Sequence, residues 1–95
     1  MGNSGMSYTH AAGLTWDRVE DRVVVLDTSG SEMITLNPVA SMLWPRLVPR
    51  ASADDLVQVL SEEFSTVPEQ QIRDDVAAFI EELLGEGLLE VSRDE

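Results

Sequence analysis

Four pairs of adjacent carboxylates are the side chains in this sequence best suited to acid–base chemistry. They are Asp54 with Asp55, Glu62 with Glu63, Asp74 with Asp75, and Glu81 with Glu82. Paired carboxylates can divide the roles of general acid and general base between them. All four pairs, however, stand opposite the apolar positions of amphipathic helical patterns, where carboxylates form a solvated face. We therefore interpret them as surface charge.

Other kinds of catalytic site lack their essential residues. The sequence has no cysteine, which removes disulfides, thiolate metal sites and cysteine nucleophiles. Its one histidine, His10, lies in a segment that we expect to be disordered and solvated, so neither a Ser-His-Asp triad nor a histidine-bearing metal site can be built around it. No glycine-rich phosphate loop or calcium-binding loop is present. The sequence predicts a protein that is not an enzyme and that has no cofactor or metal.

Charge is distributed unevenly along the 95 residues. The formal net charge is −12, from 6 basic residues, all of them Arg, and 18 acidic ones. Residues 1–50 hold four Arg and five carboxylates, whereas residues 51–95 hold two Arg and thirteen carboxylates. Binding to nucleic acid needs a basic surface that displaces counterions from phosphates, so this balance disfavours a nucleic-acid partner.

Hydrophobic patterning places short strands before helices. Leu14–Trp16, Val23–Leu26 and Met33–Leu36 are apolar or β-branched runs between polar turns, and they predict a three-stranded antiparallel meander. Residues 1–13 are small and polar, and predict a disordered N-terminal segment before a single peptide-binding domain over residues 14–95. No stretch resembles a signal peptide or a membrane span, so we expect a cytoplasmic protein without a membrane partner.

Three helix starts follow the strands. They are predicted at Asn37–Pro38, at Ser52–Asp55 and at Thr66–Glu69, where side-chain caps meet the apolar spacing of helices. Pro45 is expected to end or kink the first helix, because proline lacks the N–H that a helix interior needs. The third and longest helix is expected over about Pro68–Glu86. The order of elements predicts an α+β, winged-helix-like fold, with a three-stranded antiparallel sheet followed by three helices.

The strand Met33–Leu36 is the remaining candidate for binding. Proteins usually protect an edge strand with charge, proline or cover, and this strand has none of them internally. If it is an edge, an extended peptide can pair with its free main-chain groups and place alternate side chains against a packed helix. If it is central, or too short to matter, no such site exists. The pattern favours the two equally.

Several segments form a joint pattern over about residues 14–91. They are Val24-Val25-Leu26-Asp27, Ile34-Thr35-Leu36-Asn37-Pro38-Val39-Ala40, Leu43-Trp44, Asp75-Val76-Ala77-Ala78-Phe79-Ile80-Glu81-Glu82-Leu83 and Gly87-Leu88-Leu89. Together they resemble the PqqD-like RiPP recognition elements, small peptide-binding domains of ribosomal-peptide natural-product biosynthesis. A separate chain of this size with Leu-Asn-Pro-Val-Ala most resembles the leader-peptide-binding protein of lasso-peptide biosynthesis.

The resemblance implies a non-catalytic protein that binds the leader peptide of a ribosomally made precursor by strand addition and presents it to a separate leader protease and cyclase. The peptide is then expected along the third strand and against the third helix. The strand would supply Met33, Ile34, Thr35 and Leu36, and the helix Arg73, Val76, Ala77 and Ile80. A helix rotated by one position exchanges this helix set for Ile72, Asp75 and Phe79, and Glu32 is a further candidate. The acidic helix predicts that a leader with basic residues binds, and more weakly at high salt.

Two other functions remain open at this point. Within the same family, the chain could be a peptide chaperone for a radical SAM enzyme, as in quinone-cofactor biosynthesis. In another class, it could be a winged-helix nucleic-acid binder or an acidic decoy of one, although the acidic C-terminal half argues against contact with phosphates.

Overall fold

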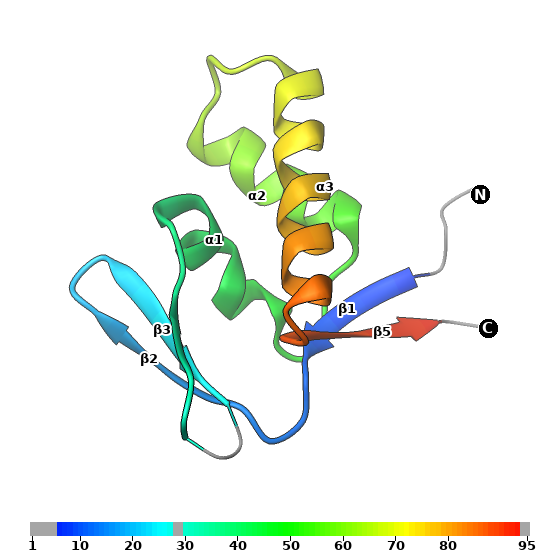
Figure 1. The fold of residues 1–95 in the computed structure, drawn as a ribbon. Helices are drawn as coiled ribbons and strands as arrows, with labels where there is room; N and C mark the ends of the chain where they lie inside the picture. The colour runs from blue at the N-terminus through cyan, green and yellow to red at the C-terminus, as the bar shows by residue number, and fades with distance from the viewer. Residues whose placement is uncertain (1–5, 28–29, 94–95) are drawn as a thin grey trace.

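The computed structural model describes residues 6–27 and 30–93, which form two small sheets and three α-helices around a shared core (Figure 1). The elements in chain order are β1 (Met6–His10), β2 (Thr15–Val19), β3 (Arg22–Leu26), β4 (Met33–Thr35), α1 (Pro38–Leu43), the 3-10 helix η1 (Trp44–Leu47), α2 (Ala53–Glu63), α3 (Glu69–Gly85) and β5 (Leu89–Arg93). The predicted α+β fold, with a three-stranded antiparallel sheet followed by three helices, is confirmed. None of the described helices is long and apolar enough to cross a membrane.

The three-stranded sheet has the strand order β2-β3-β4, and both pairings are antiparallel. Val23 and Val25 of β3 are buried, while Arg22 is exposed and Val24 is half-buried. This alternation with a period of two gives the central strand one face for the core. β4 pairs only with β3 and is an edge strand. Of the two interpretations of Met33–Leu36, the edge strand is therefore confirmed.

The start and end of α1 follow from local signals. The Asn37 side chain accepts a hydrogen bond from the Ala40 N–H at 2.8 Å, and Pro38 occupies the first turn, where a helix needs no N–H donor. The α-helix ends at Leu43, and Pro45 lies in the following 3-10 turn, as predicted. The cap thus begins α1 directly after β4.

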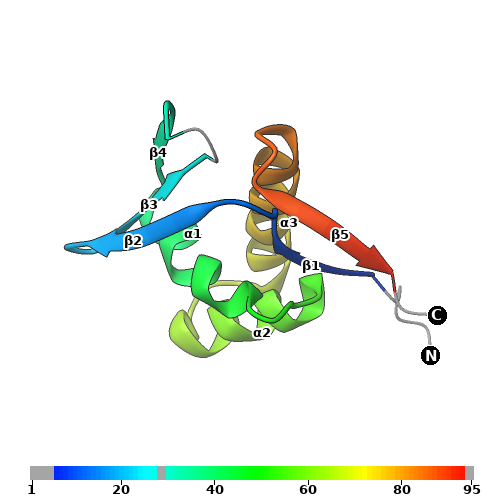
Figure 2. The same cartoon turned by 90° about the horizontal axis from the view of Figure 1, so that it is seen from below.

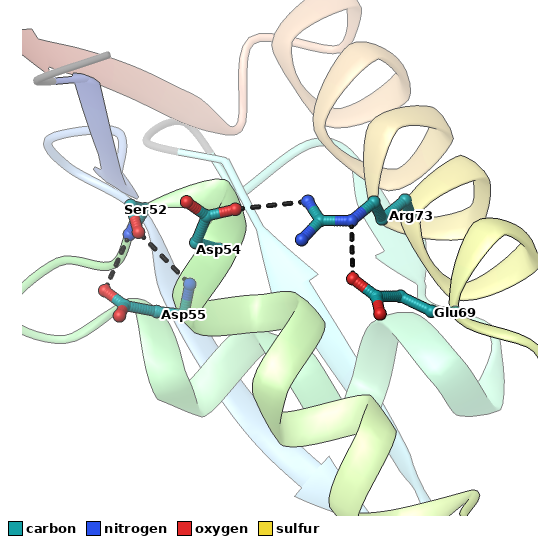
Figure 3. Close-up of polar contacts among 5 residues, drawn as sticks. All are labelled: Ser52, Asp54, Asp55, Glu69 and Arg73. Carbon is teal, nitrogen blue, oxygen red and sulfur yellow. Dashed lines mark hydrogen bonds and ion pairs between the residues drawn. The ribbon is translucent and has the colours of Figure 1, made fainter. Parts of the chain in front are cut away.

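The starts of α2 and α3 differ in how they are capped. Ser52 and Asp55 form the predicted capping box at α2, with hydrogen bonds of 3.0 and 3.1 Å (Figure 3). At α3 the predicted cap from Thr66 is wrong, because Pro68 occupies the N-cap position and makes no side-chain cap. Proline has no side-chain acceptor, so α3 begins at Glu69 without one.

A left-handed glycine ends α3. Gly87 has φ of +78°, and its N–H donates to the Leu84 carbonyl at 3.1 Å. The next residue, Leu88, donates to the Leu83 carbonyl at 2.9 Å, which completes a Schellman motif. The motif turns the chain back, so that Leu88 is buried at the start of the last strand segment.

Residues 6–10 contradict the prediction of a disordered N-terminal segment. They form β1, which pairs antiparallel with β5 along its whole length. Its other edge meets Ala51, since Tyr8 and Ala51 exchange two N–H···O bonds of 2.8 and 3.0 Å. β1 is held entirely by segments distant in sequence, which local patterning does not reveal. Residues 1–5 of the predicted segment lie outside the described residues.

One core joins these layers. Its largest fully buried hydrophobic side chains are Trp44, Leu43, Leu47, Leu56, Leu60, Val23, Val25 and Val76. They come from the central strand and from the inner faces of all the helical segments. Figures 1 and 2 show β4 and the β1–β5 pair on opposite sides of α3. The exposed side of β4 is thereby left without a neighbouring strand.

Candidate functional site

The outer edge of β4 carries unpaired main-chain groups. Leu36 donates its N–H to β3 at 2.9 Å, and the Glu32 carbonyl accepts from the residue after β3 at 3.3 Å. In an antiparallel ladder, the N–H and C=O groups of alternate residues point toward the partner strand. Those of Ile34, which lies between Glu32 and Leu36, therefore also point toward β3. The N–H and C=O groups of Met33 and Thr35 therefore point away from the sheet and are available to a further strand.

A hollow of about 170 Å³ lies beside this edge, between β4 and α3. Its lining residues are Ile34, Thr35, Leu36, Asn37, Ala40, Glu82, Leu83, Glu86 and Leu88. Leu36, Leu83 and Leu88 are buried and form an apolar floor, whereas Glu82 and Glu86 are exposed at the rim. The hollow thus combines apolar contact area with negative charge.

A second hollow of about 220 Å³ continues along α3. Its lining residues are Asn37, Val39, Ala40, Asp75, Ala78, Phe79 and Glu82. Asn37, Ala40 and Glu82 line both hollows, so the two adjoin. We call the pair of hollows the β4–α3 groove. The small side chains of Ala40 and Ala78 keep it open between α1 and α3.

The predicted strand residues fall at the groove, in two roles. Ile34 is half-buried and Leu36 is buried, and both line the groove together with Thr35. Met33 is 68% exposed, and because side chains alternate along a strand it lies on the opposite face from Ile34. Glu32 is exposed just before the strand. Met33 therefore contributes main-chain N–H and C=O groups to the open edge, and its side chain does not line the groove.

Arg73 lies on the other side of α3. Its guanidinium donates hydrogen bonds to Asp54 of α2 at 3.2 Å and to Glu69 at 3.0 Å (Figure 3). Both hydrogen bonds raise the pKa of Arg73, and the bond to Asp54 has the larger effect. Ala77 is exposed one helical turn beyond Arg73. The ion pair with Asp54 holds Arg73 toward α2, and neither Arg73 nor Ala77 lines either hollow, so a peptide contact by these two residues stays a prediction.

The other predicted helix residues divide between core and groove. Val76, Ile80 and Ile72 are buried in the core and line neither hollow. Asp75 and Phe79, which belong to the alternative helix register, do line the groove. The third member of that register, Ile72, does not line it, so only part of the alternative set lies at the groove wall. Which of these residues contact a peptide stays a prediction.

Sequence reasoning missed five residues that line the groove, Asn37, Val39, Ala40, Leu83 and Leu88. It also missed Ala78, Glu82 and Glu86 on the exposed face of the α3 wall. The signal was present, because Asp75, Ala78, Glu82 and Glu86 recur at spacings of three and four, as one helix face requires. Asp75 was singled out, and following it along the same face leads to the other three.

The groove is negatively charged along α3. Asp75, Glu82 and Glu86 line it, and no cationic side chain in the described part of the chain does. Among the described residues, none of these three carboxylates has a side-chain hydrogen bond or an ion pair. Within that same part of the chain, no group of three His, Asp or Glu side chains is placed to hold a metal ion. The groove offers unpaired carboxylates above an apolar floor.

His10 is packed into the structure, contrary to the expectation of a solvated residue. Its Nε2 donates to the Trp44 carbonyl at 2.8 Å, and its ring stacks on the Trp44 ring with centroids 3.8 Å apart. Trp16 meets both rings edge-on. Burial lowers the pKa of His10, and the hydrogen bond to the Trp44 carbonyl opposes this in part. We call these three residues the aromatic cluster, which lies away from the β4–α3 groove.

The opposite edge of the sheet has a hollow of another kind. It measures about 420 Å³ and lies beside β2. Its lining residues are Arg18, Asp21, Met42, Pro45, Arg46, Val59, Glu62 and Glu63. This β2 hollow contains both signs of charge, unlike the β4–α3 groove.

Comparison with protein families gives one match. The profile of the family described as coenzyme PQQ synthesis protein D (PqqD) matches residues 22–89. This span contains β3, β4, all three α-helices and both walls of the groove. No curated protein sequence matches the chain.

Solved structures with the same fold include two protein–peptide complexes. TbiB1 in complex with the TbiA(beta) leader peptide superposes with a TM-score of 0.78 at 22% sequence identity, over 86% of this chain and 94% of that chain. A lasso peptide synthetase B1 complexed with the leader peptide superposes with a TM-score of 0.75 at 24% identity, over 87% of this chain and 96% of that one. The similarity covers almost the whole of both chains.

Proposed function

The chain belongs to the PqqD family, and from this premise we propose that it binds the leader peptide of a ribosomally made precursor along the open edge of β4. The observation that carries the proposal is the coincidence of two features in one place. The edge strand exposes the main-chain groups of Met33 and Thr35, and the β4–α3 groove lies directly beside it. Two proteins of the same fold are described as bound to leader peptides, which supports the same ligand class here.

Binding then proceeds by strand addition. An extended peptide accepts hydrogen bonds from the N–H groups of Met33 and Thr35 and donates to their carbonyls, extending the sheet from three strands to four. Cross-strand neighbours share a face, so the peptide residues opposite Ile34 and Leu36 place their side chains in the groove. Main-chain pairing provides affinity that is independent of sequence, and the groove selects side chains.

In this proposal the chain has no reaction of its own. It holds the leader in a defined conformation and presents the attached precursor to a separate leader protease and a cyclase, as in lasso-peptide biosynthesis. Precursor peptides are made on ribosomes, so we assign the protein to the cytoplasm.

The alternatives fit less well. The family description names coenzyme PQQ synthesis, which keeps the peptide chaperone of a radical SAM enzyme as the second candidate. Both structural matches are instead complexes with leader peptides, and one of them is a lasso peptide synthetase B1. Co-purification of the tagged chain with a protease and a cyclase, or with an iron–sulfur enzyme, separates the two. Carboxylates without cations line the groove, which is unsuited to phosphates.

Amide hydrogen exchange tests the strand addition directly. The probe is a synthetic precursor leader peptide, chosen from the short open reading frames near the gene for this chain. In the free protein the Met33 and Thr35 amides face outward and should exchange rapidly, whereas the Ile34 amide is already protected by β3. Saturating leader should protect Met33 and Thr35 strongly and leave Ile34 nearly unchanged. Binding without this alternating protection would contradict strand addition, and no binding would contradict leader recognition.

A further inference from the structure

Resting on the proposed function, we infer that the peptide accepted by the β4–α3 groove carries Arg or Lys at alternate positions, with their cationic ends at Glu82 and Glu86. The inference names a substrate class, a basic strand-forming peptide. It goes beyond the general expectation of attraction to an acidic helix, because it places the basic residues in a register.

The first step is the spacing of the two partners. In an added strand, the side chains that enter the groove come from every second residue, about 6.6 Å apart along the peptide. Glu82 lies in the last turn of α3 and Glu86 is the C-cap residue of that helix, four residues further on, which is a rise of about 6 Å. Both carboxylates line the hollow that contains Ile34 and Leu36 of the strand segment. Two successive groove-facing residues of the peptide therefore match the two carboxylates.

The second step is the shape of that hollow. Its floor is apolar, formed by the buried side chains of Leu36, Leu83 and Leu88, and its rim carries carboxylates. A short apolar residue would cover the floor and leave the rim unpaired. Arg and Lys have long aliphatic stems with a charged end, so they can cover apolar surface and still reach a charged rim. The hollow is thus shaped for an amphipathic cation.

The third step is the state of the carboxylates. Asp75, Glu82 and Glu86 have no side-chain ion pair or hydrogen bond among the described residues. Arg73, the one arginine of α3, is engaged by Asp54 and Glu69 on the other side of the helix. A bound cation would meet carboxylates that have no competing partner, and an acidic peptide would be repelled by all three. Charge complementarity therefore favours a basic occupant.

The experiment begins with selection from a display library of random linear peptides, with binding at the β4 edge confirmed by protection of the Met33 and Thr35 amides. We expect selected peptides to be enriched in Arg and Lys at alternate positions. A selected peptide should bind about two- to fivefold more weakly to Glu82→Gln, as for a partly exposed ion pair, and raising the salt from about 50 mM to about 500 mM should weaken it similarly.

Glu81→Gln is the matched control, because it removes the same charge from the neighbouring position of α3, which lines neither hollow. It should change affinity less than Glu82→Gln. Replacing the peptide's groove-facing Arg by Gln should abolish the difference between the two variants. The double reversal Glu82→Lys with Glu86→Lys should shift selection toward acidic peptides.

The outcomes separate the two proposals. Peptides that protect the β4 edge but show no basic enrichment, or that lose equal affinity with Glu81→Gln and Glu82→Gln, overturn the charge inference and leave the strand addition standing. If no selected peptide or leader protects the β4 edge, the proposed function fails, and the inference fails with it.

Discussion

The two edges of the three-stranded sheet are built from similar backbone and have opposite surroundings. β4 contains no charged residue, and its outward main-chain groups lie beside a groove whose charges are all negative. β2 contains Asp17 and Arg18, and the hollow beside it contains Arg46, Glu62 and Glu63. Charge on an edge strand is a common protection against unwanted pairing. The sheet is thus protected at one edge and open at the other.

This difference between the β2 and β4 edges shows where a domain of this size can bind a ligand. A chain of 95 residues has a thin core and little room for an enclosed ligand cavity. An open edge needs no cavity, because main-chain groups supply the hydrogen bonds. What makes β4 selective is the helix wall that α3 places next to it, since a bare edge would accept any extended chain.

The largest expected effect comes from removing one outward N–H from each edge strand in turn and comparing leader affinity. Met33→Pro deletes such a donor at the first residue of β4, a position where strands tolerate proline. We expect leader affinity to fall about tenfold or more, since a buried partner is left unsatisfied. The measurement is fluorescence anisotropy with labelled leader.

Arg18→Pro is the matched control at the other edge. Val23 accepts from β4, so alternation along β3 directs Val24 toward β2 and leaves Arg18 facing outward. This variant should keep the affinity of the unmodified chain. Met33→Ala should also bind normally, which separates the lost N–H from the lost side chain. Equal losses in the two proline variants would remove the distinction between the edges.

A second test concerns the wall of the groove. Ala78 lines the groove and is exposed, so Ala78→Leu should fill the space that a peptide side chain occupies. We expect affinity to fall about five- to tenfold, a steric cost of roughly 1–3 kcal/mol being typical of overfilled sites. Ala77→Leu is the control, because Ala77 is exposed one turn beyond Arg73 and lines neither hollow. If Ala77→Leu caused the larger loss, the peptide would lie on the side of α3 first predicted from the sequence.

This pair of alanines also shows what the sequence could and could not predict. The buried stripe of α3 is readable from apolar spacing, and Ile72, Val76 and Ile80 are indeed in the core. The groove residues flank this stripe on one side, and the row of Arg73 and Ala77 flanks it on the other. Both rows have helical spacing, so the sequence alone does not show which of them faces β4; that depends on how α3 packs against the rest of the fold.

The same distinction between local and distant causes applies to the strands and caps. Asn37 and Ser52 cap helices through bonds to residues three positions away, and both were predictable. β1 depends on β5 at the far end of the chain and on Ala51, and its own sequence has no strand pattern. Without β1 there was no reason to place His10 against Trp44. β1 and His10 were misjudged because their positions depend on long-range pairing, whereas the wrong cap at Thr66 was a local error, since Pro68 takes the N-cap position.

The smallest expected effect concerns pH, and it should act on the β2 side of the molecule. The Trp44 carbonyl can only accept a hydrogen bond, so His10 carries its proton on Nε2 in the neutral form. Burial lowers the pKa of His10 below that of the unfolded chain, about 6.5. The unfolded state therefore binds more protons as the pH falls through about 6.5, and the folded state loses stability in that range.

His10→Phe isolates this effect, because phenylalanine can stack on Trp44 and does not titrate. Between about pH 7.5 and about pH 5.5, the Tm of the unmodified chain should fall by about 1–3 °C more than that of the variant. Equal slopes would mean that the His10 ring does not titrate differently on folding. Leader affinity should not follow this transition, because the aromatic cluster lies beside β2 and no histidine lines the β4–α3 groove. If leader affinity and Tm changed over the same pH range, the protonation of His10 beside β2 would affect binding at β4, contrary to this expectation.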